Sequence, residues 1–208
     1  MKHFYKVLVP LIFSIISYCA FGQQNNSSWK KTFSKKGVGF VRLGDDLETT
    51  ITSLQNYFVI EVDSIPVGLF NNGKYEQIYI AKDQNNKVVF KFTRSETLNT
   101  INCIELYCES YTSNKGLRIG CTLKDVKEKY KKLKVNYFFD NVLYVYPENT
   151  NYGLRLHTNS LSGEEHVQID YGEITPESIP DKLVIDMIVI VDKKTDSKRN
   201  KKRLRQKN

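Results

Sequence analysis

A short motif occurs twice in this chain and constrains its fold more than any other feature. Residues 42–47 read RLGDDL, and residues 118–123 read RIGCTL. The two copies are offset by 76 residues. Recurrence at a fixed offset predicts that one small structural unit is present twice.

Each copy has the pattern of a tight glycine turn followed by the start of a helix. Thr122 is a good N-cap, because its hydroxyl can accept a hydrogen bond from the backbone N–H of Asp125. Asp125 itself favours the positive end of the helix dipole. Apolar residues then follow at helical spacing. These are Leu123, Val126, Tyr130 and Leu133 in the second copy, and Leu47, Ile51, Leu54 and Phe58 in the first.

Segments rich in β-branched and aromatic residues follow each expected helix, as is typical of strands. They cover residues 58–62, 75–81, 87–92 and 100–108 in the first unit, and 135–139, 142–146, 153–157 and 183–191 in the second. The acidic segment 158–182 reads as an insertion with a short strand at 167–171. The predicted fold class is α+β, with two tandem repeats that each pack a helix on a small antiparallel sheet.

The first 22 residues have the pattern of a secretory signal peptide. Lys2 and Lys6 precede an apolar run at 7–17, and Ala20-Phe21-Gly22 is a small-x-small cleavage site. An uncleaved anchor is less favoured, because the run is shorter than the roughly 20 residues that span a bilayer. Lipid attachment through Cys19 is disfavoured by the large Tyr18 before it. We expect export to the periplasm or beyond, with cleavage near Gly22.

The positive charge of the chain is concentrated at its end. The chain carries +8, but residues 193–208 hold nine Lys or Arg and one Asp, and the first 22 residues add +2, so residues 23–192 carry −2. The tail has one Leu and no aromatic residue, and we expect it to be disordered. It could solubilise the protein or contact an anionic surface. We expect no nucleic-acid binding, because the slightly acidic folded part offers no basic groove in its sequence.

The expected domain organisation follows from these patterns. The segments are a signal peptide at 1–22, a flexible leader at 23–36, repeat unit one at 37–112, repeat unit two at 113–192, and a disordered basic tail at 193–208.

Three cysteines remain after cleavage, namely Cys103, Cys108 and Cys121. In an oxidising compartment Cys108 and Cys121 could form a disulfide across the junction of the two units. All three could equally be small core residues, since free cysteines are often buried.

Alternation along the expected strands leaves aromatic and charged side chains on the sheet faces turned away from the helices. Tyr and Arg combine large contact areas with hydrogen-bonding tips, the chemistry that concentrates binding energy at protein interfaces. The candidate binding residues are Tyr144, Tyr146, Arg155, His157, Tyr79 and Tyr107. For Tyr79 this assignment assumes that Ile78 and Ile80 point toward the helix.

Patterns of catalytic residues are scarce. The mature chain has two histidines, His157 and His166, and neither lies in an HExxH or GxSxG motif. A metal site built from these histidines and Asp170 would lack the paired short spacings of structural zinc sites. We therefore expect no catalytic residue, metal or cofactor. The alternative is a small metal-dependent hydrolase that uses the histidines and the acidic insertion.

A tandem of units, each a glycine-turn-capped helix followed by an antiparallel meander, resembles the β-lactamase inhibitory protein family. The resemblance covers about residues 38–192 and rests on RLGDDL and RIGCTL. In that family the sheets form a concave surface that grips another protein, so the resemblance implies a non-enzymatic binding module with a protein partner. The chain lacks an obvious disulfide within each repeat and a counterpart of the inhibitory loop, so no inhibitory residue is carried over. An envelope assembly or structural role is the alternative.

Overall fold

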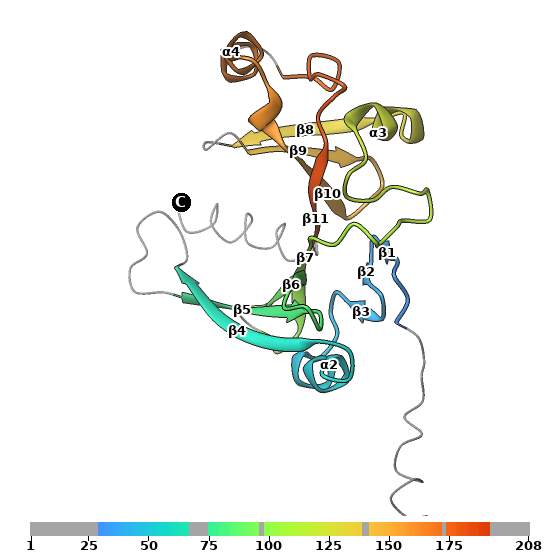
Figure 1. Ribbon diagram of the computed structural model, residues 1–208, viewed down its shortest axis with the longest axis vertical. Coiled ribbons are helices and arrows are strands. Elements are labelled where there is room, and N and C mark those ends of the chain that lie inside the picture. The colour runs from blue at the N-terminus through green and yellow to red at the C-terminus, as the bar shows by residue number, and fades with distance from the viewer. Residues whose placement is uncertain (1–28, 67–74, 96–97, 139–141, 172–173, 192–208) are drawn as a thin grey trace, which may run out of the picture.

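A computed structural model describes residues 29–66, 75–95, 98–138, 142–171 and 174–191 (Figure 1). These residues are mostly β, with 45% strand and 16% helix. The predicted signal peptide, residues 23–28 of the leader and the basic tail lie outside the described residues. Within the described ranges, no helix is both long enough and apolar enough to cross a membrane.

One antiparallel sheet of eight strands organises the molecule, in the order β4-β5-β6-β7-β11-β10-β9-β8. The positions of the eight strands predicted outside the acidic insertion are confirmed to within four residues at each end. The strands are β4 (Val59–Pro66), β5 (Tyr75–Lys82), β6 (Val88–Arg94), β7 (Ile101–Leu106), β8 (Leu133–Phe138), β9 (Val142–Pro147), β10 (Tyr152–Leu156) and β11 (Ile185–Val191).

This sheet overturns the predicted fold class. An α+β fold of two tandem helix-on-sheet units needs two small sheets, but β7 pairs with β11, with Leu106 opposite Ile188 and Ile104 opposite Ile190. Strands from both halves of the chain therefore belong to a single sheet. The physical reason is that two separate sheets would each expose an edge of unpaired N–H and C=O groups, whereas this pairing satisfies them and buries the isoleucines.

The segment before the first motif forms a second, three-stranded sheet of β1 (Phe33–Ser34), β2 (Gly37–Val38) and β3 (Val41–Arg42). The expectation of a flexible leader was wrong for residues 29–36. Trp29 lies among aromatic rings, with its ring centroid 4.9 Å from that of Phe58 and 5.9 Å from that of Phe90. Burial of this aromatic surface outweighs the polar composition of the segment.

Helices begin at both motif copies, as predicted. In α2 (Leu47–Leu54) the Asp46 side chain accepts the backbone N–H of Thr49 at 2.9 Å. In α3 (Leu123–Lys129) Thr122 and Asp125 form a capping box. The helical stripe ends earlier than expected, because Tyr130 is the C-cap and Leu133 belongs to β8.

The acidic insertion contains a helix where a short strand was expected. After a 3-10 turn, η1 (Thr158–Ser160), helix α4 covers Gly163–Tyr171. Ser162 and Glu165 form reciprocal hydrogen bonds, Ser162 N to Glu165 Oε2 at 2.7 Å and Glu165 N to Ser162 Oγ at 3.3 Å. This capping-box chemistry starts a helix, so the strand prediction at 167–171 was wrong.

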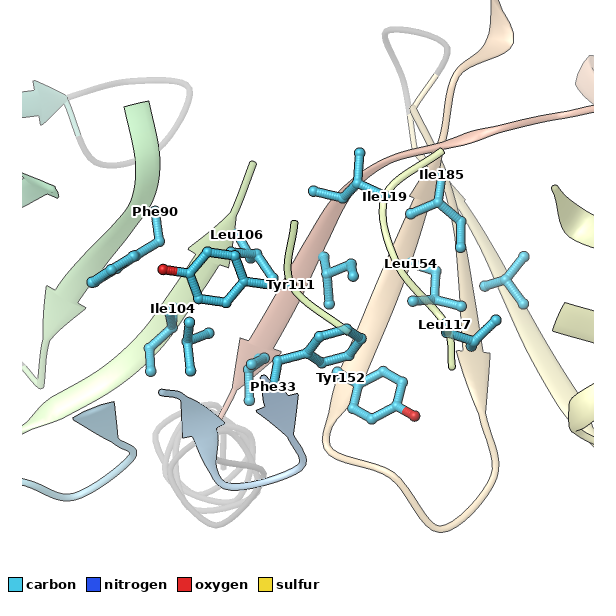
Figure 2. Packing of buried hydrophobic residues seen from close by; sticks show 14 of the residues in the cluster. Phe33, Phe90, Ile104, Leu106, Tyr111, Leu117, Ile119, Tyr152, Leu154 and Ile185 are labelled. Carbon is cyan, nitrogen blue, oxygen red and sulfur yellow. The ribbon is translucent and has the colours of Figure 1, made fainter. Parts of the chain in front are cut away.

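A continuous hydrophobic core covers one face of the large sheet (Figure 2). Buried side chains from β6, β7, β10 and β11, including Phe90, Ile104 and Leu154, share it with Phe33 of β1 and Leu117 of the loop before α3. Phe33 packs edge-to-face on Tyr152 with ring centroids 5.5 Å apart. The core therefore runs without interruption across the strands of both halves.

Candidate binding surface

Strand register separates the large sheet into two faces. One face carries the core. The other, here called the polar face, carries Lys91 of β6, Glu105 of β7, Arg155 of β10 and Tyr144 of β9, with β11 between β7 and β10. Lys91 lies opposite Glu105, and Arg155 lies opposite Tyr144. Directly opposed residues point to the same side of a sheet. Strand β11 links the two pairs, because Val189 lies opposite both Glu105 and Gly153, and Gly153 is two residues from Arg155 in β10. These four side chains therefore share one face.

Arg155 is held in place by Asp186. Its Nε donates to Asp186 Oδ1 at 2.7 Å and its Nη2 donates to Asp186 Oδ2 at 3.1 Å. The register between β10 and β11 shifts at Arg155 and Leu156, and this bulge accommodates Asp186 between Ile185 and Met187. The hydrogen bonds to Asp186 raise the pKa of Arg155. The result is a guanidinium with a fixed orientation.

Tyr107 directly follows β7 and is fixed by its neighbours. Its hydroxyl donates to Glu105 Oε2 at 2.6 Å, and the ammonium of Lys91 lies 5.3 Å from its ring centroid. Burial, and then the carboxylate of Glu105, raise the pKa of Tyr107, whereas the charge of Arg155 lowers it. Tyr107 is therefore neutral at physiological pH and donates a hydrogen bond.

Aromatic rings continue the polar face onto β9. Tyr144 and Tyr146 stack with centroids 6.0 Å apart, and Phe138 packs edge-to-face on Tyr144 at 5.9 Å. The ring of Tyr146 lies close to Gly153, where an added Cβ would come within 2.6 Å of Tyr146 Cε1. Burial raises the pKa of Tyr144, Arg155 lowers it and Glu105 raises it.

The structure thus brings four predicted site residues together and separates two others. Tyr107, Tyr144, Tyr146 and Arg155 are partly exposed on the polar face. His157 is exposed just beyond the end of β10, where its backbone N–H donates to Val184 O at 2.8 Å.

Tyr79 is not on the polar face, and its prediction was wrong. It is only 7% exposed and stacks on Phe92 with centroids 5.3 Å apart. The cause is the β5–β6 register, which sets Tyr79 opposite Phe92. Ile78 and Ile80, expected to point inward, are partly exposed on the other side.

Asp186 was missed by the sequence reasoning. One feature of the sequence could have indicated its role, because Asp186 is the single carboxylate inside the otherwise apolar run IDMIVIV. Charged residues inside an apolar strand are rarely left unpaired, so Asp186 needed a cationic partner on a neighbouring strand.

The described cysteines and histidines form neither the predicted disulfide nor a cluster of metal ligands. Cys103, Cys108 and Cys121 are partly exposed. Cys108 and Cys121 are free thiols, and Cys108 Sγ lies 3.2 Å from Ser110 Oγ, so the disulfide between Cys108 and Cys121 is not formed in this structure. Among the described residues, no three or more His, Cys, Asp or Glu gather as metal ligands would.

Comparisons with known proteins bear on the fold. No protein-family model and no curated protein sequence matches the chain. The structure is similar to the crystal structure of yfeY, an uncharacterised protein from Escherichia coli, with a TM-score of 0.56 and 11% sequence identity over 78% of this chain and 99% of that chain. This likeness shows the fold alone.

Proposed function

We propose that the protein is an exported, non-enzymatic binding module that contacts a protein partner through the polar face. The observation that carries the proposal is the fixed, partly exposed group of Tyr107, Tyr144, Tyr146 and Arg155 on one side of the sheet. Each is held by a hydrogen bond, an ion pair or a ring contact to its neighbours.

Preorganisation is the physical argument for binding. Association costs about 0.5–1.5 kcal/mol for each flexible side chain that becomes immobilised. A guanidinium already oriented by Asp186 and rings already stacked reduce that cost. Tyr and Arg are also the residue types that most often dominate binding energy at interfaces.

Export is the second part of the proposal and rests on the sequence of the first 22 residues. We expect the protein in the extracytoplasmic fraction to begin at Gln23. Amino-terminal sequencing or intact-mass measurement tests this directly. A mature chain that retains Met1 would contradict it.

The binding experiment uses Tyr144→Ala with Tyr146→Ala. The matched control is Tyr75→Ala with Leu98→Ala, because Tyr75 and Leu98 are 63% and 62% exposed and Tyr75 shares the strand face of Tyr79. Wild type and both variants are used as baits in envelope extract of the source organism. A protein enriched by wild type and control is then purified, and its Kd is measured for all three.

We expect the polar-face variant to lose at least about tenfold in affinity, and the control to stay within about twofold of wild type. Thermal unfolding of each variant separates loss of binding from loss of fold. Equal affinities for all three proteins would overturn the proposal. The proposal would also be overturned if the polar-face variant keeps the Tm of the wild type and enriches the same proteins from the envelope extract.

A further inference from the structure

A second surface of the folded part concentrates positive charge. Two hollows meet at Tyr130, with volumes of about 660 and 530 Å³. Tyr130 and Glu148 line both hollows. We call the two together the lysine groove.

The lining of the lysine groove is strongly cationic. It includes seven lysines and two glutamates, for a formal charge of +5. Residues 23–192 as a whole carry −2, so the residues of this range outside the groove lining carry a net charge of −2 − 5 = −7. Five of the seven lysines lie between residues 115 and 134, and Lys35 and Lys36 come from the turn between β1 and β2. The first hollow has Lys127, Lys131, Lys132 and Lys134, and the second has Lys35, Lys36 and Lys115.

Several of these lysines are available to a ligand. Lys127 is paired with Asp181 at 2.5 Å, and Lys132 lies 3.8 Å from Glu148 with 76% of its side chain exposed. Lys36, Lys131 and Lys134 are exposed, and no carboxylate of the described residues lies within ion-pair distance of them. Their ammonium groups are therefore in water, and an anion could approach them without breaking an existing ion pair.

The floor of the lysine groove is rigid and polar. The Tyr130 and Tyr152 hydroxyl groups share a hydrogen bond. The ammonium of Lys115 donates to Lys129 O at 3.2 Å and lies 4.1 Å from the Tyr130 ring centroid. Tyr152 in turn packs on Phe33 of β1 (Figure 2). The two hollows thus have a fixed relation to each other through Tyr130.

We propose that the lysine groove binds a linear anionic polysaccharide. Two connected open hollows fit a chain better than a single small anion. The cations are lysines with no arginine among them, and lysine acts as a point charge that tolerates carboxylate or sulfate at varied angles, whereas arginine selects planar bidentate partners. The exposed side-chain amide of Asn149 suits sugar hydroxyls, and the Thr175 hydroxyl, which accepts from Ser178 N, keeps its O–H to donate.

Two other polyanions fit the described surface less well. Peripheral membrane binding normally adds apolar side chains that enter the lipid, and none of the large apolar residues most exposed in the described part of the chain lines either hollow. Single-stranded nucleic acid needs accessible aromatic platforms, but Tyr152 is 4% exposed and Lys115 lies over the Tyr130 ring.

The test measures binding of the full mature chain to a heparin dodecasaccharide by calorimetry at two salt concentrations. The groove variant is Lys131→Glu with Lys134→Glu. The control is Lys87→Glu with Arg94→Glu, which makes the same change in net charge at exposed positions of the β5–β6 turn and β6. The basic tail is identical in all three proteins, so it cannot account for a difference between them.

We expect the groove variant to bind at least about tenfold more weakly than wild type and to show a smaller salt dependence, and the control to change less than about threefold. Lys36→Glu changes a lysine of the second hollow. It should also lower the affinity for the dodecasaccharide and leave the Tm of the protein unchanged. Equal losses in groove variant and control would overturn the proposal, because net charge alone would then explain binding. Tighter, groove-dependent binding of oligo-dT or of phosphatidylglycerol vesicles would also overturn it, in favour of a nucleic acid or a membrane.

Discussion

Arg155 and Asp186 form a two-pronged ion pair at the bulge between β10 and β11, with Nε to Oδ1 at 2.7 Å and Nη2 to Oδ2 at 3.1 Å. The two side chains are 32% and 28% exposed, so the pair is partly shielded from solvent. It fixes a cation on the polar face and stabilises an irregular point in the pairing of two central strands.

Replacing Asp186 with Asn tests this role. The amide keeps the shape but removes the charge and one of the two acceptors, so we expect a loss of about 1–2 kcal/mol in the free energy of unfolding. Asp181→Asn is the control, since Asp181 is 55% exposed and makes a surface pair with Lys127, and we expect it to cost about 0–1 kcal/mol. Urea denaturation measures both. Equal costs would show that the Arg155 pair is an ordinary surface pair.

Tyr79 offers a second prediction, because the structure places it in the core. Its ring stacks on Phe92, and its hydroxyl donates to Gln77 Oε1 at 3.1 Å. We expect Tyr79→Ala to cost about 3–5 kcal/mol, as for other buried aromatic truncations, and Tyr79→Phe to cost about 1 kcal/mol for the lost hydrogen bond. Thermal and urea unfolding give both values. If the Tyr79→Ala protein is as stable as wild type, the Tyr79 ring is not part of the core.

Local chemistry made parts of the fold predictable. The starts of α2 and α3 follow from Asp46 and Thr122, whose side chains can satisfy free backbone N–H groups within three residues. The same chemistry at Ser162 and Glu165 is the local signal for the start of α4, although Val167 and Ile169 after it are β-branched residues typical of strands. Strand positions follow from composition, and the inward side of β6, β7, β9 and β10 follows from alternation.

Long-range pairing was not predictable in the same way. Whether Phe92 faces Tyr79 or Ile80 depends on a register that differs by one residue, and the sequence of β5 has apolar residues at both phases. Similarly, Leu106 and Ile188 are 82 positions apart in the chain, and nothing local to either predicts their contact. The polar face depends both on strand register and on which distant strands pair. The contact between Asp186 and Arg155 could therefore not be predicted from the sequence, and it is seen only in the structure.

Trp29 is the only tryptophan and reports on the packing of the segment before β1. Gly39, at φ +59°, lies so close that an added Cβ would be 2.5 Å from Trp29 Cζ2. We expect Gly39→Ala to shift the native Trp29 emission to longer wavelength and to cost about 2–4 kcal/mol, from the clash and the left-handed backbone together. Fluorescence-monitored unfolding measures both effects.

Gly116→Ala is the matched control for that experiment. Gly116 also has a positive φ, +72°, but an added Cβ would meet nothing within 4 Å. We expect it to cost about 1–2 kcal/mol for the backbone alone and to leave Trp29 emission unchanged. Identical emission for wild type and Gly39→Ala would contradict packing of Trp29 on this turn.

The capping box of α3 predicts a pH dependence. Thr122 N and Oγ1 lie 2.7 and 2.8 Å from Asp125 Oδ2, and hydrogen bonds from Thr122 hold the pKa of Asp125 below its usual value. A carboxyl whose folded pKa is lowered stabilises the protein above its unfolded pKa, about 3.9, and this contribution disappears as pH falls through the folded pKa. Asp125→Asn should therefore cost about 0.3–1 kcal/mol at pH 7 and progressively less below about pH 4. Chemical unfolding of both proteins between pH 7 and pH 3 tests this. If the difference in free energy of unfolding between the two proteins stays constant down to pH 3, the charge of Asp125 contributes nothing to stability. If that difference grows as the pH falls, the charge of Asp125 destabilises the folded protein.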